Sequence, residues 1–120
     1  MLALLVAVFA VPSVIYVALA RHAQPRLVGL ICFVVHACLV LILAVDILVE
    51  MRQSGEALMG WLLVDIFDFP ASVIHIGTDY LLSGTRFGTF WVSNYTLPLL
   101  GGLIFGSTQW GLVAWGLAAV

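Results

Sequence analysis

Four long apolar runs, separated by short polar segments, constrain the fold of this chain more than any other feature of its sequence. A helix needs about 20 apolar residues to cross the hydrocarbon core of a bilayer, which is about 30 Å thick. The pattern predicts an all-α, polytopic membrane protein with four transmembrane helices in a small bundle, forming a single membrane domain over residues 1–120. The predicted helices cover residues 2–20, 27–49, 57–82 and 97–119.

The composition agrees with a lipid environment and excludes one class of partner. Hydrophobic residues make up 64% of the chain and charged residues 8%, which leaves too little polar surface to cover a soluble domain. A bilayer removes the need for a polar exterior, so we expect the lipid bilayer to surround the protein. The formal net charge is -2. A chain without a basic patch has no electrostatic attraction for nucleic acid, and we expect no nucleic-acid partner.

The arginines between the runs predict an orientation, because positive charge in short loops favours the cytoplasmic side. Arg21 and Arg26 lie in the first loop and Arg86 in the third, against Arg52 alone in the second. We therefore expect the first and third loops to be cytoplasmic. Both termini would then lie on the outer, periplasmic side of a bacterial inner membrane.

Polar residues of the third run share one face of a helix. At 100° per residue they fall within an arc about 80° wide, although Pro70 divides the run and can rotate its two halves. The five residues are Asp65, Asp68, Ser72, His75 and Asp79.

The second run repeats this pattern more faintly, with Cys32, His36, Asp46 and Glu50 on one side. Charged side chains at mid-membrane cost several kcal/mol, so they normally face the bundle interior and find partners there. We expect the stripes of the second and third helices to face each other. The cysteines Cys32 and Cys38 point in directions about 240° apart, so they cannot bond to each other, and we expect two small buried side chains.

The fourth run carries Gly102, Gly106 and Gln109 on one face, within a G-x-x-x-G pattern that lets another backbone approach closely. That backbone is another helix of this chain, a second copy that self-associates through this helix, or another membrane subunit. Pro98 lies near the predicted start, where the first helical turn tolerates proline.

Three interpretations of the polar residues remain open. In the structural one, Asp68-Phe69-Pro70 marks a break, and Asp68 caps the following half-helix. In the second, the acidic and histidine residues form a proton or cation pathway. In the third, His36 and His75 hold a metal or haem. No H-x-x-H, E-x-x-H or C-x-x-C spacing supports such a site, so we expect no metal and no cofactor.

The chain resembles a broad class of small bacterial inner-membrane proteins with four helices, to which no activity is assigned. The resemblance rests on Asp68-Phe69-Pro70, Gly101-Gly102 and Gln109-Trp110. It implies the architecture only. No nucleophile motif or phosphate loop is present, so we expect no catalytic residue. The sequence favours a structural or interaction component of a membrane complex, and the alternative is a proton or cation translocating element.

Overall fold

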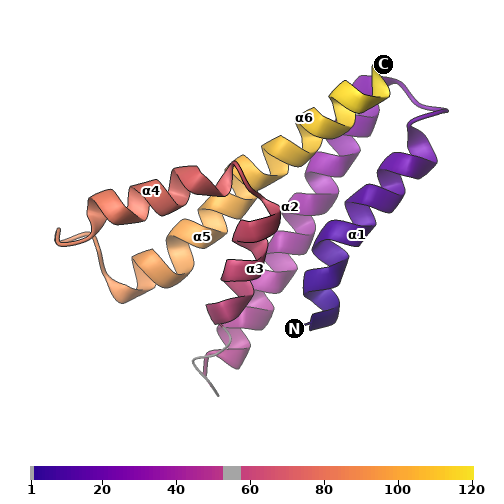
Figure 1. Cartoon of the computed structure of the whole chain (residues 1–120). Coiled ribbons are helices and arrows are strands. Elements are labelled where there is room, and N and C mark those ends of the chain that lie inside the picture. The colour runs from indigo at the N-terminus through magenta and orange to yellow at the C-terminus, as the bar shows by residue number, and fades with distance from the viewer. Residues whose placement is uncertain (1, 53–57) are drawn as a thin grey trace.

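The computed structural model describes residues 2–52 and 58–120 of the chain, and this part is helical and holds no strand (Figure 1). The all-α prediction is therefore confirmed. The elements are α1 (Leu2–Leu19), α2 (Pro25–Glu50), α3 (Met59–Phe67), α4 (Ser72–Leu82), the π-helical η2 (Val92–Thr96), α5 (Leu97–Leu100), the π-helical η3 (Gly101–Gly106) and α6 (Ser107–Ala118).

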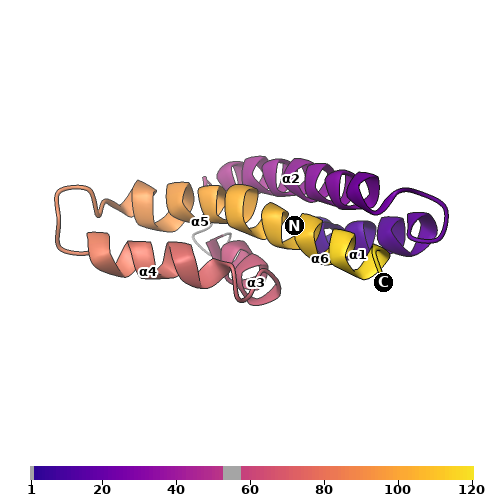
Figure 2. The same ribbon diagram turned by 90° about the horizontal axis from the view of Figure 1, so that it is seen from above.

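Two helices are long and apolar enough to cross a membrane: α2, and the continuous helix Val92–Ala118 formed by η2, α5, η3 and α6. The apolar part of α1, Val6–Leu19, is shorter. Helices α1 and α2 form an antiparallel hairpin, and α6 packs along α2 (Figures 1 and 2). The predicted helices 2–20 and 27–49 match α1 and α2 to within two residues at each end.

The last long helix begins earlier than predicted, at Val92 instead of residue 97. Pro98 therefore lies inside the helix and not in its first turn. Proline has no N–H to donate and its ring disturbs the preceding turn. The π-helical turns η2 and η3, which flank the short α5, allow the helix to continue through this position.

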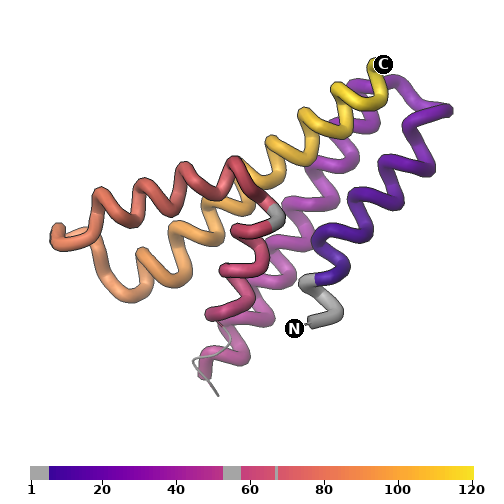
Figure 3. The backbone as a smooth tube through the Cα atoms, viewed as in Figure 1, coloured from indigo at the N-terminus to yellow at the C-terminus, as the bar shows by residue number. Residues whose placement is uncertain are grey.

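The third predicted helix is wrong as a single element, because the chain breaks between α3 and α4 at residues 68–71. Residue 57, its predicted start, lies outside the described residues. The break coincides with Pro70, whose ring is incompatible with a continuous helix, and the Phe69-Pro70 peptide bond is cis. A tube through the Cα atoms shows the sharp change of direction here (Figure 3).

Helix α3 runs antiparallel to α2 and ends about halfway along α2 (Figure 1). Near the start of α3, Trp61 packs edge-on against Tyr95, with ring centroids 6.0 Å apart, and the Tyr95 hydroxyl donates to the carbonyl oxygen of Ala44 at 3.0 Å. Just after α3 ends, the carboxylate of Asp68 lies 3.3 Å from the ring of His36. His36 is near the middle of the 26-residue α2.

Helix α4 then returns toward the level at which α3 began. Asp68 lies against Gly106, and His75, seven residues further on, lies against Gly101. Helix α4 therefore runs antiparallel to the first half of the helix Val92–Ala118. The α3–α4 pair is therefore a bent hairpin whose tip, residues 68–71, lies at mid-height of the bundle (Figures 1 and 3).

The two ends of the chain lie at opposite ends of the bundle (Figure 1). Ala118 packs in one cluster with Leu19 and Ala23, where α1 connects to α2. Val8, close to the start of α1, packs instead with Ala44 and Ile47 near the end of α2. Successive helices α1, α2 and Val92–Ala118 therefore alternate in direction.

Apolar side chains cover the outside of the long helices, whereas several polar side chains are buried between the helices. The buried polar residues His36, Asp68, Ser72, His75 and Ser107 are at most 6% exposed. Many large aliphatic side chains on α1, α2, α4 and α6 are at least half exposed. They include Val14, Val17, Leu30, Ile42, Val45, Ile74, Ile76, Leu112 and Leu117.

Both cysteines are free, as the helical geometry predicts. Cys32 is buried, and its thiol lies 3.6 Å from the carbonyl oxygen of Pro12. The expectation that both are buried is wrong for Cys38, which lies on the outer face of α2 and is exposed.

Candidate functional site

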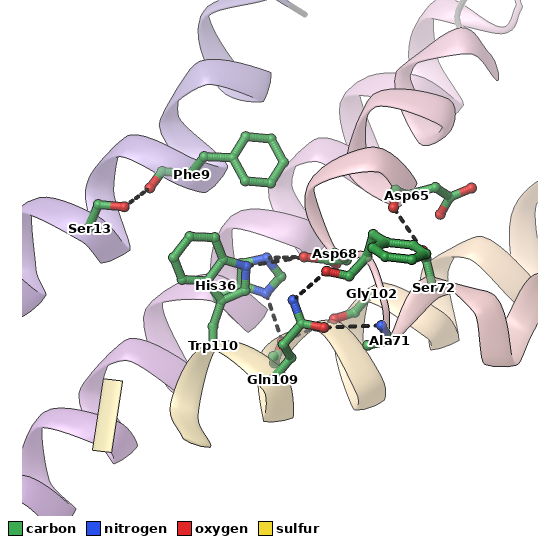
Figure 4. Close-up of polar contacts among 12 residues, drawn as sticks. Phe9, Ser13, His36, Asp65, Asp68, Ala71, Ser72, Gly102, Gln109 and Trp110 are labelled. Atoms are coloured by element: carbon green, nitrogen blue, oxygen red, sulfur yellow. Dashed lines mark hydrogen bonds and ion pairs between the residues drawn. The ribbon is translucent and has the colours of Figure 1, made fainter. Parts of the chain in front are cut away.

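The centre of the bundle holds a pair formed by His36 of α2 and Asp68 at the α3–α4 break. His36 Nε2 lies 3.3 Å from Asp68 Oδ1, and their side chains are 0% and 3% exposed. Two residues of α6 complete the cluster. Ser107 Oγ lies 3.1 Å from His36 Nδ1, and the indole N–H of Trp110 donates to Asp68 Oδ1 at 3.1 Å (Figure 4).

The Ser107 hydroxyl orients the imidazole ring of His36. The Ser107 hydroxyl donates to the carbonyl oxygen of Gly102 at 3.1 Å, so its oxygen accepts from His36 Nδ1, which carries a proton. His36 Nε2 lies near a carboxylate oxygen of Asp68, but the two atoms do not form a hydrogen bond. A basic group beside the carboxylate reduces the cost of burying both in a low-dielectric interior.

Gln109 of α6 satisfies the open backbone at the break. Its Oε1 accepts from the Ala71 N–H at 3.0 Å, and its Nε2 donates to the Phe69 carbonyl oxygen at 3.2 Å (Figure 4). The interpretation of Asp68 as the cap of the half-helix is wrong, because α4 has no side-chain cap hydrogen bond at its start. Gln109, about 40 residues away in the sequence, pairs with this backbone instead. The Asp68 carboxylate contacts His36 and accepts from Trp110.

A second histidine–aspartate pair bridges the two half-helices. His75 Nε2 of α4 lies 3.0 Å from Asp65 Oδ1 of α3, and these side chains are 7% and 17% exposed. The Ser72 hydroxyl donates to the carbonyl oxygen of Asp65 at 2.8 Å. Both interactions connect α3 to α4 across the break and hold the bend between them.

Glycines of the last long helix make room for both pairs. A Cβ at Gly106 would overlap the Asp68 carboxylate, and a Cβ at Gly101 would overlap the His75 ring. At Gly102 a Cβ would meet Val40 at 3.2 Å. Gly102 thus packs against α2, whereas Gly106 and Gln109 pack against the break between α3 and α4 of the same chain.

No protein-family model, curated protein or solved structure matches this chain. Its resemblance to small four-helix inner-membrane proteins therefore stays a prediction.

The structure brings together five of the predicted polar-stripe residues, in two groups: His36 with Asp68, and Asp65 with Ser72 and His75. Two others lie apart. Asp46 is ten residues beyond His36, or about 15 Å along the helix, and is half-buried. Asp79 is one turn beyond His75 and also half-buried.

Sequence reasoning missed Ser107 and Trp110, which complete the central cluster. A signal was available for Trp110, because it follows Gly106 by four residues and so lies on the same face of the helix. Among the described residues, no three histidine, cysteine, aspartate or glutamate side chains converge as a metal site would require. Each buried histidine is instead paired with one aspartate.

Proposed function

We propose that the chain is an integral membrane protein that serves as a structural or interaction component of a membrane complex. The observation that carries this proposal is the distribution of side chains, with apolar residues exposed on the long helices and the ionisable pair His36–Asp68 buried at mid-height. Water favours the opposite distribution, whereas lipid favours this one, since an intramembrane charge faces the bundle interior and finds a partner there.

In this proposal four segments enter the membrane and three cross it. Helices α1, α2 and Val92–Ala118 cross, while α3 and α4 form a re-entrant pair. The half-helices have nine and eleven residues, hence lengths of about 14 and 17 Å, against a hydrocarbon core of about 30 Å. Neither crosses alone, and together they reach mid-height and return.

Backbone polar groups at the re-entrant tip pair within the protein, as a bilayer requires, since lipid offers no hydrogen-bond partners. The side chains of Phe69 and Pro70 at the tip are apolar and exposed. Here Gln109 pairs with the N–H of Ala71 and the carbonyl oxygen of Phe69, and Asp68 docks between α2 and α6. The contacts of Gln109 and Asp68 thus hold the tip against α2 and α6.

This arrangement revises the predicted orientation. A re-entrant pair places the third loop on the same side as the second, so Arg86 joins Arg52, opposite Arg21 and Arg26. The arginines then divide equally and no longer favour an orientation. Three crossings also place the two ends of the chain on opposite sides of the membrane, in contrast to the expectation that both are periplasmic.

The burial of the His36–Asp68 cluster favours a component of a membrane complex over a lone transporter, because a transport pathway needs groups that a substrate can reach. His36 and Asp68 are almost fully buried, and His36 Nδ1 and Asp68 Oδ1 each pair with a side chain of α6. Solubilisation of native membranes in a mild detergent tests this function. The chain, of 13.0 kDa, should migrate within a larger assembly, and migration as a single chain under these conditions would argue against it.

One observation favours a second function, proton or cation translocation. Two buried histidine–aspartate pairs lie along the re-entrant element, and among the described residues Asp68 Oδ2 has no hydrogen-bond partner. Carboxylate and imidazole chains are what proton pathways use.

Purified protein in liposomes with an imposed pH gradient separates the two functions. A structural component leaves the decay of the gradient equal to that of protein-free liposomes. Translocation through the cluster accelerates the decay, and Asp68→Asn and His75→Gln abolish the acceleration. His22→Gln is the matched control, since His22 lies outside the cluster in the α1–α2 connection.

A further inference from the structure

A groove runs down the outside of the bundle between the start of α2 and the end of α6. Its volume is about 490 Å³, within the range of about 300–1,000 Å³ that is usual for ligand pockets. Arg26 and Trp115 lie at its outer end. The remaining lining residues continue about two turns inward and are Gly29, Leu30, Phe33, Thr108, Gly111 and Leu112.

The floor of the groove exists because two glycines allow the helices to approach. A Cβ at Gly29 would lie 2.8 Å from the carbonyl oxygen of Gly111, and one at Gly111 would lie 3.1 Å from Phe33 Cβ. The walls rise on either side, where the aliphatic side chains of Leu30 and Leu112 are more than half exposed. The result is an apolar groove that is open to the outside of the bundle, where the proposed arrangement places lipid.

The outer end of the groove is positive. Arg26 lies in the first turn of α2, where the helix dipole adds partial positive charge, and none of the described residues forms an ion pair with it. The sequence holds no aspartate or glutamate before Asp46 and none after Asp79, so α1, α6 and the first half of α2 carry no acid. Arg21 lies at the same end but lines a separate pocket with Val120.

We propose that this groove binds an anionic phospholipid, with the phosphate on Arg26 and an acyl chain along the apolar part of the groove between Gly29 and Thr108. Guanidinium is the side chain best matched to phosphate. Trp115, which is 43% exposed, stands where an indole ring meets the headgroup region. The groove is too apolar for a soluble anion, and the unpaired arginine distinguishes this surface from the rest of the lipid-facing surface. The proposal rests on the proposed membrane location of the chain.

Native mass spectrometry of the purified full chain in detergent, with added phosphatidylglycerol or phosphatidylcholine, tests the site. We expect phosphatidylglycerol to be retained about fivefold more than phosphatidylcholine, which corresponds to about 1 kcal/mol for one arginine near anionic lipid. Arg26→Gln should reduce this preference to less than twofold, whereas Arg52→Gln, at the other end of α2, should leave it unchanged. Equal retention of the two lipids by the wild-type protein, or equal effects of both substitutions, would overturn the proposal.

A second variant tests the apolar part of the groove without touching the charge. Thr108→Phe places a ring in the groove and should lower the retention of phosphatidylglycerol at least fivefold, whereas Ile104→Phe, one turn earlier on the exposed face of the helix and outside the groove, should not. Retention unaffected by Thr108→Phe would contradict the assigned place. Resistance of each variant to extraction from membranes by alkaline carbonate reports the membrane location separately, so failure of the lipid site and failure of the proposed function are distinguishable.

Discussion

The indole ring of Trp110 stacks on the imidazole ring of His36, with ring centroids 5.8 Å apart and planes inclined by 24°. The same indole donates its N–H to the carboxylate of Asp68, the partner of His36. One residue of α6 thereby fixes both members of the pair, and the stack and the hydrogen bond can be separated by substitution.

Trp110→Phe keeps an aromatic ring against His36 but removes the donor to Asp68. A hydrogen bond contributes about 0.5–1.5 kcal/mol between neutral groups and about 1.5–3 kcal/mol to a charged group, so we expect the free energy of unfolding to fall by about 0.5–3 kcal/mol. Titration with dodecyl sulfate in mixed micelles measures it. Trp115→Phe makes the same change at an exposed indole and should alter the stability by less than about 0.5 kcal/mol. Equal effects of the two substitutions would show that the Asp68 bond adds nothing.

Gly106→Ala should destabilise the fold, because the added Cβ would overlap the Asp68 carboxylate, which His36 and Trp110 hold in place. Overpacking of this kind costs about 1–3 kcal/mol. Gly116→Ala, on the same helix, meets nothing within 4 Å and should be neutral or stabilising, since alanine is the better helix former. A stable Gly106→Ala protein would refute the close packing of the tip against η3.

Gln109→Ala should loosen the break between α3 and α4, because it removes the side chain that pairs with the backbone of Phe69 and Ala71. Hydrogen–deuterium exchange should increase at least tenfold at residues 69–74 and remain unchanged in α1. Thr108→Ala is the control, since the Thr108 hydroxyl bonds only within its own helix, to the carbonyl oxygen of Ile104. Unchanged exchange at the tip would mean that Gln109 is not what holds it.

The residues that meet in the cluster were partly predictable from the sequence. Helical projection groups Asp65, Asp68 and His75 and sets His36 toward them, because buried charge in an apolar run needs an internal partner. The structure brings these residues together, but in two pairs. Helical projection assumes one straight helix. Because the chain bends at Pro70, Asp68 instead pairs with His36 of α2, and His75 pairs with Asp65.

The reversal of direction between α3 and α4 was not predictable from local patterns. A run of 26 residues, 57–82, is long enough to cross a bilayer, and nothing within it shows that its second half turns back. The bend is held by Gln109, which is 38 residues from Ala71 in the sequence, and by glycines that accept Asp68 and His75. The π-helical turns around Pro98 also depend on packing, since proline alone predicts a helix start.

The most direct test of the membrane arrangement is the side from which the loop between α4 and the last long helix can be labelled. In a background with Cys32→Ala and Cys38→Ala, single cysteines at His22, Arg52 and Thr85 report the three connections. A membrane-impermeant maleimide applied to sealed, oriented vesicles should label Thr85→Cys from the same side as Arg52→Cys, and His22→Cys from the opposite side. Labelling of Thr85→Cys from the side of His22→Cys would mean that α3 and α4 cross the membrane together, and would contradict the re-entrant pair.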